Sequence, residues 1–174
     1  HVPDPIALLR AARDCLVDSG MLLVEDTDAA SGWVSDPPFL ANDFLHKAHA
    51  ELSRKLGADV ERGRMIGRFM KEIGMKEIGC DSYVPLFGRG GIKVSSSKVS
   101  VDKSERDVQD KFSLGLQIIK MSIHTIKPKF LEHGICTQDE LEKASASIAE
   151  VEASSGYQLF SCPGGKIFQW WSVK

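Results

Sequence analysis

Residues 21–28 read MLLVEDTD, and this stretch decides the fold class that we expect for the chain. Its first half, 21–24, is apolar at four consecutive positions and follows a helical pattern that Gly20 closes. A short run that is apolar on both strand faces is typical of a strand buried inside a parallel sheet. Its second half is acidic, at the end of a strand where ligand sites gather in α/β proteins. We therefore predict an α/β fold with residues 21–24 in the middle of a sheet.

Hydrophobic periodicity predicts helices and further strands around this central strand. Asp4 and Pro5 open the first helix, since Asp caps a helix and Pro suits its first position. Trp170 and Trp171 point to opposite faces of the last strand, so that one of them belongs to the core. The remaining expected elements are helices over about 39–56, 62–73 and 105–126 (with Pro128 limiting the end), a helix after the capping box Thr137–Glu140, and strands at 76–85, 157–162 and 167–173.

The composition indicates one globular domain over residues 1–174. The chain is 43% hydrophobic and 26% charged, and its net charge of −2 gives no electrostatic footprint for nucleic acid. No apolar run approaches the ~20 residues of a membrane span, so we expect no membrane association. Four widely spaced cysteines without a CxxC motif, and no signal peptide, favour reduced thiols and a cytoplasmic location. Residues 88–106, rich in Gly, Ser and Lys, are expected to form a mobile excursion.

The expected strands make up only half of a sheet. A central strand needs partners on both sides, and the elements above supply them on one side, where residues 167–173 are expected to pair with 21–24. The sequence also begins at His1 without an initiator methionine, which suggests a piece of a longer protein. We expect the open edge to be met by a second copy of the chain or by a complementing chain, and the alternative is that residues 88–106 or 157–162 fold back to cover it. Leu23 is expected to lie in the core.

Four segments carry a resemblance to a known family. They are HVPDP with LLR at residues 1–10, RDCLVDSG at 13–20 before the central strand, GRMIGRFMKEIGM at 63–75, and GICTQDEL at 134–141. In this order they resemble the C-terminal half of a class I S-adenosylmethionine-dependent methyltransferase. The group concerned includes the ubiquinone/menaquinone C-methyltransferases and many secondary-metabolite methyltransferases. The resemblance spans essentially the whole chain.

The resemblance implies a Rossmann-like sheet with flanking helices and an antiparallel closing strand. It also implies methyl transfer from S-adenosyl-L-methionine to a small-molecule acceptor. The chain departs from the family in lacking the G-x-G-x-G cofactor loop and the carboxylate that holds the cofactor ribose, and residues 88–91 (GRGG) do not replace them. We therefore expect the chain alone to bind the cofactor weakly. The alternative is a methyltransferase-fold remnant that acts as a non-catalytic partner or scaffold subunit.

Five residues are candidates for the site. The resemblance places His1 beside the cofactor, where the alternative is a turn residue at a chain terminus. Asp26 and Asp28 follow the central strand, and one of them is a candidate general base or acceptor-orienting group, against the alternative of solvated carboxylates. Trp33 is a candidate lining residue of an acceptor pocket or else an anchor for its loop. Arg64 is a candidate contact for a polar acceptor or else a solvated helix residue.

Two pairs of residues have the spacing of metal ligands. His133 and Cys136 are three residues apart, and so are His46 and His49 on an expected helix. Neither pair has a third or fourth ligand in register, so we expect no metal site.

Overall fold

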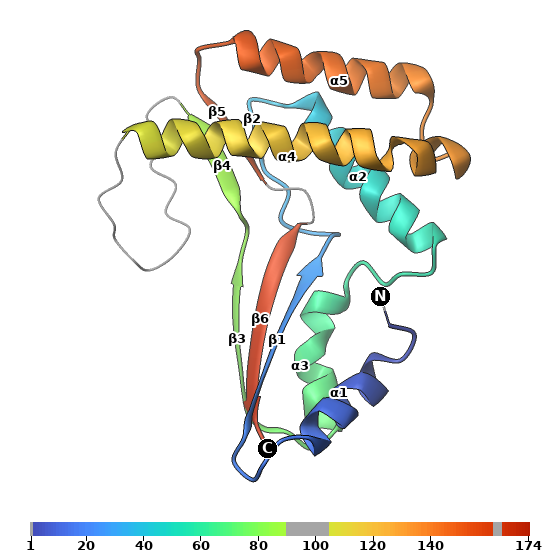
Figure 1. Cartoon of the computed structure of the whole chain (residues 1–174), viewed down its shortest axis with the longest axis vertical. Coiled ribbons are helices and arrows are strands. Elements are labelled where there is room, and N and C mark those ends of the chain that lie inside the picture. Colours follow the sequence, from blue (N-terminus) through green and yellow to red (C-terminus); the bar gives the residue numbers. More distant parts are fainter. Residues whose placement is uncertain (1, 90–104, 162–164) are drawn as a thin grey trace.

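The computed structural model describes residues 2–89, 105–161 and 165–174, with the backbone alone for 105–110. The chain forms two stacked parts (Figure 1). The lower part holds helices α1 (Pro5–Asp14) and α3 (Arg62–Glu72) and a sheet of β1 (Met21–Asp28), β3 (Lys76–Tyr83) and β6 (Lys166–Val173). The upper part holds α2 (Leu40–Lys55), α4 (Glu105–Glu132), α5 (Gln138–Ala153) and a sheet of β2 (Ser35–Asp36), β4 (Leu86–Arg89) and β5 (Gln158–Ser161).

The lower sheet has the order β1-β6-β3, with the last strand of the chain in the middle. Strand β6 runs antiparallel to both neighbours, so that Trp171 lies opposite Leu23 on one side and opposite Gly79 on the other. Strands β1 and β3 are therefore parallel to each other, although they do not touch. This confirms the predicted antiparallel closing strand and its pairing with residues 21–24. The α/β class is also confirmed, as a mixed fold of five helices and two small sheets of antiparallel pairs among the described residues.

The environment predicted for residues 21–24 is wrong. Strand β1 forms only antiparallel pairs and is an edge strand of the described sheet. Its side chains alternate in exposure: Leu22 and Val24 pack against the core beside α3, whereas Met21 and Leu23 are both 64% exposed. Leu23 is thus not a core residue in the described structure. An apolar run shows that both faces can be buried, but only packing decides which face receives a helix.

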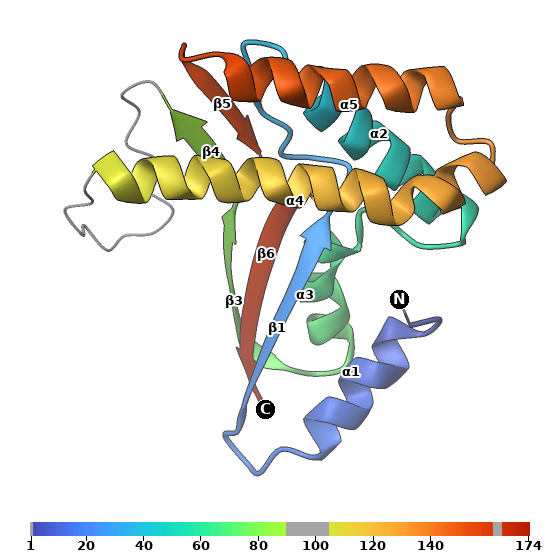
Figure 2. The ribbon, with the colours of Figure 1, turned by 45° about the horizontal axis from the view of Figure 1, so that its top comes forward.

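Helix α3 covers one face of the lower sheet and makes its core. Ile66, Phe69 and Met70 of α3 are buried with Leu9 of α1, and Trp170 of β6 packs against them. The prediction that one tryptophan of the pair is core is confirmed. In Figures 1 and 2, α1 and α3 lie on the same side of the sheet.

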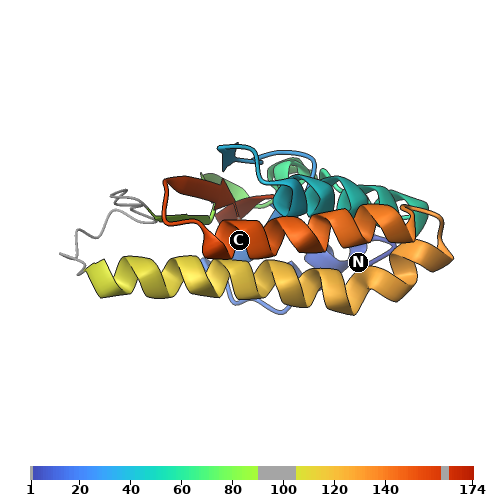
Figure 3. The ribbon, with the colours of Figure 1, turned by 90° about the horizontal axis from the view of Figure 1, so that it is seen from above.

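The upper part packs around phenylalanine side chains. The ring of Phe160, which is fully buried, meets Phe39 and Phe112 edge-on at centroid distances of 5.3 and 5.6 Å. Seen from above, α2, α4 and α5 lie side by side over this core (Figure 3). Helix α5 begins at the predicted capping box, in which the Thr137 hydroxyl accepts from the Glu140 N–H and the Glu140 carboxylate accepts from the Thr137 N–H.

Three local expectations need correction. Helix α4 continues through Pro128 to Glu132, because Phe130 beyond the proline is fully buried in the upper core and holds the last turn. Ser35–Asp36 form the short strand β2, in a stretch where no strand was expected. Of the expected excursion, Gly88 and Arg89 belong to β4 and 105–106 to α4. Residues 90–104 lie outside the described residues. Arg89 is only 8% exposed because its guanidinium donates to the Val151 carbonyl at 2.5 Å.

The expected positions of the other elements are confirmed to within a few residues. Asp4 caps α1 by accepting from the Ala7 N–H at 2.9 Å. Within the part of the chain that the structure describes, no helix has the length and apolar character that crossing a membrane requires.

Candidate functional site

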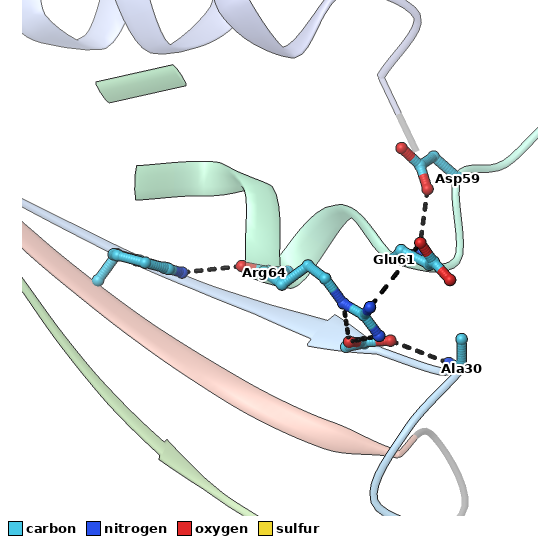
Figure 4. A network of polar contacts seen from close by, with 7 residues as sticks. Ala30, Asp59, Glu61 and Arg64 are labelled. Atoms are coloured by element: carbon cyan, nitrogen blue, oxygen red, sulfur yellow. Dashed lines mark hydrogen bonds and ion pairs between the residues drawn. The ribbon is translucent and has the colours of Figure 1, made fainter. Parts of the chain in front are cut away.

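The carboxyl end of β1 carries a buried ion pair. Asp28 is 1% exposed, and its Oδ2 accepts a hydrogen bond from Arg64 Nε at 2.5 Å and also pairs with Arg64 Nη2. Its Oδ1 accepts from the Ala30 N–H at 3.0 Å. Figure 4 shows Arg64 reaching from the first turn of α3 towards the end of β1, with Ala30 on the far side. Both oxygens of Asp28 are therefore occupied within the chain.

Close packing of α3 on β1 makes this ion pair possible. A Cβ on Gly63 would lie 2.7 Å from the carbonyl carbon and oxygen of Thr27, so the glycine lets the two backbones approach. The Trp170 indole fixes the same turn by donating from Nε1 to the Gly63 carbonyl at 2.8 Å. Arg64 is 44% exposed, and the hydrogen bond that it donates to Asp28 is the main cause that raises the pKa of its guanidinium. Glu61 lies further off, with 3.9 Å between its Oε2 and Arg64 Nη1.

Asp26 lies on the same strand face as Asp28 but is less buried. Its Oδ1 accepts from the Thr27 N–H at 2.7 Å, which leaves Oδ2 without a partner among the described residues. Glu25 points to the opposite face, where its Oε2 accepts from Gln169 Nε2 at 2.6 Å. Asp26 and Glu25 therefore each keep one carboxylate oxygen without a partner among the described residues, and of the two only Asp26 lies on the strand face of Asp28.

Trp33 packs against a buried histidine. The Trp33 ring lies 5.0 Å from the ring of His46 between centroids, and His46 Nε2 lies 3.0 Å from the Ser161 hydroxyl. Burial, and to a lesser degree the nearby His49, lowers the pKa of His46 to about 4, so the ring is neutral at pH 7. Trp33 is 37% exposed and also lines an open hollow of about 420 Å³ on the outer side of α2.

A larger pocket lies on the opposite side of α2. Its volume is about 470 Å³, within the range of small-molecule sites. It is bounded by the chain start at Val2 and Pro3, the second half of α2, the first residue of α3 and the end of α4. The loop before α3 is joined to the end of β1 by the hydrogen bond from the Ala29 N–H to the Val60 carbonyl at 2.8 Å. The pocket is thus close to the carboxyl end of the sheet.

The structure brings only some of the predicted site residues together. Asp28 and Arg64 form one contact and Trp33 forms another with His46, but no hydrogen bond, ion pair or ring contact between described residues joins these two pairs. His1 lies outside the described residues. The sequence analysis did not find the pocket beside α2, which Arg62 lines. The signal in the sequence that could have pointed to this pocket is Arg62 itself, a basic residue at the predicted start of a helix.

Metal ligands do not gather in the described residues. No group of three or more His, Cys, Asp or Glu side chains with the geometry of a metal site occurs in the part of the chain that was described. His133 and Cys136 therefore remain a pair without further ligands there. The pKa of the Cys136 thiol is raised by burial and by the nearby Glu140, so that the neutral thiol is favoured.

Comparisons with known proteins do not assign a family. No protein-family model and no curated protein matches the chain.

Proposed function

We propose that the chain is the C-terminal part of a class I S-adenosylmethionine-dependent methyltransferase domain. The reaction is methyl transfer from S-adenosyl-L-methionine to a small-molecule acceptor. The cofactor-binding half of the domain is supplied by a segment outside residues 1–174. The observation that carries the proposal is the position of the last strand, antiparallel between β1 and β3.

The topology supports the proposal in detail. The resemblance implies that residues 21–28 are the fifth strand of the family sheet, that the helix over 62–73 precedes the sixth strand, and that the last strand closes the sheet. In the structure, β1 is followed after α2 by α3 and β3, and β6 then enters between β1 and β3. A chain that merely added strands in sequence would place β6 at an edge. Sequential strands are neighbours in most sheets, so this arrangement is informative.

The surface of the lower sheet fits a domain with further layers. Strand β1 has no described partner on its outer edge. On the sheet face away from α3, Met21 and Leu23 are mostly exposed beside the half-buried Trp171. Adjacent apolar side chains on one open sheet face mark a surface that another element covers. A preceding strand at the β1 edge and helices over this face would cover it.

The described residues do not themselves form the cofactor site. At the end of β1, Asp28 is not available to hold the cofactor ribose, because both of its oxygens are taken up by Arg64 and Ala30. The described segment between β1 and β2 contains a single glycine, Gly32, and leads into β2 and not directly into a helix. The role of His1 beside the cofactor is therefore proposed on the resemblance alone.

The roles proposed for the other candidates follow from their surroundings. Asp26, with one carboxylate oxygen unpartnered among the described residues, is the proposed general base or acceptor-orienting group. Asp28 is proposed to position Arg64, whose half-exposed guanidinium would contact a polar acceptor. Trp33 is proposed to line the acceptor pocket from its hollow beside Ala30.

A non-catalytic partner or scaffold subunit is the second candidate. Its supporting observation is that Asp28 is committed to an internal ion pair while the edge and one face of the sheet are open. In this case the same surfaces would bind another chain without methyl transfer.

The coding sequence upstream of His1 separates the two candidates. The enzyme predicts an upstream strand followed by G-x-G-x-G and a helix, and a start codon directly before His1 would contradict it. The longer gene product is then titrated with S-adenosyl-L-methionine by calorimetry beside residues 1–174. We expect binding only by the longer product. Micromolar binding by residues 1–174 alone would overturn the assignment of the cofactor site to another segment.

The role of Asp26 is tested in the longer product. Asp26→Asn should lower kcat by a factor of about 10² or more, as expected for loss of a general base, with cofactor affinity unchanged. Glu25→Gln is the matched control, because Glu25 is the neighbouring carboxylate on the opposite strand face. Equal kcat values for the two variants would contradict the role.

A further inference from the structure

The pocket beside α2 differs in its charges from two other hollows of the described surface. The hollow that contains Trp33 also contains Glu51, and a third hollow near the C-terminus contains Asp14 and Asp18. The pocket beside α2 has no carboxylate among its lining residues, and it has the two cationic side chains of Arg62 and Lys129.

Arg62 is held in place but lacks a charged partner. Its Nη1 donates to the Val2 carbonyl at 2.9 Å, which fixes the guanidinium at the pocket wall. Its Nε is buried and makes no hydrogen bond to any described residue. No carboxylate forms an ion pair with Arg62 or with Lys129 within the described residues. A buried donor without a partner costs free energy, but Nε itself is closed to solvent and to a ligand. The donor that a ligand can reach is Nη2, which is not buried and makes no hydrogen bond to a described residue.

The remaining lining of the pocket is largely apolar. Leu52 and Leu56 of α2 and Ile126 of α4 contribute aliphatic side chains, and Ser53 adds a hydroxyl group. His49 also lines the pocket, and its burial lowers the pKa of the imidazole, so that this histidine adds no positive charge at neutral pH. An apolar wall with a few convergent polar groups is the usual character of a small-molecule site.

We propose that this pocket binds a small organic acid that has one carboxylate and an apolar body. Arg62 binds the carboxylate, with Lys129 at the rim as a second cation. Leu52, Leu56 and Ile126 contact the apolar body. A single carboxylate fits because Arg62 is the only partly buried cation of the lining, whereas Lys129 is exposed to solvent. This binding is independent of the proposed methyl transfer and needs no cofactor.

The test is a titration of the ¹⁵N-labelled chain with 4-phenylbutyrate, followed by amide chemical shifts. The neutral 4-phenylbutanol is titrated in parallel, and inorganic phosphate serves as a competitor. We expect amide shifts at Ser53, Gly57 and Arg62. The affinity for the carboxylate should be about fivefold higher than the affinity for the alcohol, because a partly solvated hydrogen bond to a charged group contributes about that much. Phosphate should not compete at about 10 mM, because it lacks the apolar body.

Variants locate the charge preference. Arg62→Gln should remove the preference for the carboxylate, whereas Arg68→Gln, on the same helix but outside the pocket, should keep it. Lys129→Gln, at an exposed position where folding is not at stake, should reduce the preference. The proposal would be overturned if acid and alcohol bound with equal affinity, or if the shifts were confined to the sheet face at Leu23. It would also be overturned if phosphate displaced the acid, or if both pocket variants kept the preference for the carboxylate. A failure of 4-phenylbutyrate to bind would overturn it too.

Discussion

The six-membered ring of Trp170 lies directly against Gly67 of α3. A Cβ at Gly67 would come closer than 3.0 Å to three atoms of that ring, a distance that side chains do not adopt. Glycine at this position therefore sets how closely α3 approaches the sheet. This contact also holds the indole where it donates to the carbonyl of Gly63, the residue directly before Arg64 of the Asp28–Arg64 pair.

Gly67→Ala should destabilise the chain. The methyl group gains helix propensity of about 0.5–1 kcal/mol but forces Trp170 or α3 to move, and overpacking costs about 1–3 kcal/mol. We expect a net loss of about 1–2 kcal/mol, measured by urea unfolding with tryptophan fluorescence. Gly156→Ala is the control, since its nearest contact would be Ser154 Oγ at an ordinary 3.5 Å. Equal stability of the two variants would contradict the close contact.

The Asp28–Arg64 pair should show strong coupling in a double-mutant cycle. Arg64→Gln leaves the buried Asp28 carboxylate without its cation, and Asp28→Asn removes the acceptor that orders Arg64. We expect each change to cost about 1–3 kcal/mol and the coupling energy to exceed about 1 kcal/mol.

The exposed pair Lys143–Asp139 is the matched control for this cycle. Its side chains are 66% and 71% exposed, with 2.7 Å between Nζ and Oδ2. A pair of this kind on a helix surface contributes at most about 0.5 kcal/mol. A coupling energy for Asp28 and Arg64 no larger than that of the control would show that burial does not strengthen the pair.

Acid should weaken the fold through His46. The unfolded state binds a proton near pH 6.5 and the folded state only near pH 4, because burial disfavours the imidazolium. Between these values the unfolded state carries more protons, so the free energy of unfolding falls as pH decreases from about 6.5 to about 4. The full contribution is roughly 3 kcal/mol, present above pH 6.5 and lost below about 4.

This pH dependence is measured by urea unfolding at several pH values. His46→Gln should flatten the profile over that window, and His49→Gln should flatten it less, since a smaller shift in the same direction is found for His49. Identical slopes for His46→Gln and the unchanged protein would contradict the burial of a neutral ring.

Leu22 and Leu23 should differ in their contribution to stability. Leu22 packs against the α3 core, so Leu22→Ala removes buried surface and should cost about 1.5–3 kcal/mol. Leu23 is 64% exposed, so Leu23→Ala should cost less than about 0.5 kcal/mol. Thermal unfolding of the two variants checks this, and a larger loss for Leu23 would mean that its face is covered in the folded protein.

Local elements of this chain followed from short stretches of residues. The cap at Asp4, the capping box at Thr137 and the alternation of Trp170 and Trp171 depend on backbone and side-chain groups a few residues apart, so the sequence was enough to predict them. The pairing of residues 21–24 with the closing strand was also predicted, because both stretches are apolar and strand-forming.

Long-range packing decided the remainder. The apolar run MLLV predicts burial on both faces, but only the face of Leu22 meets a helix, since α3 returns to one side of the sheet. Pro128 predicts a helix end, but the burial of Phe130 keeps the last turn of α4 helical. Asp28 was a candidate from its place after a strand, yet its ion pair with Arg64 depends on a helix 36 residues later approaching through Gly63. A pattern of neighbouring residues does not predict how closely two segments so far apart in the sequence approach each other.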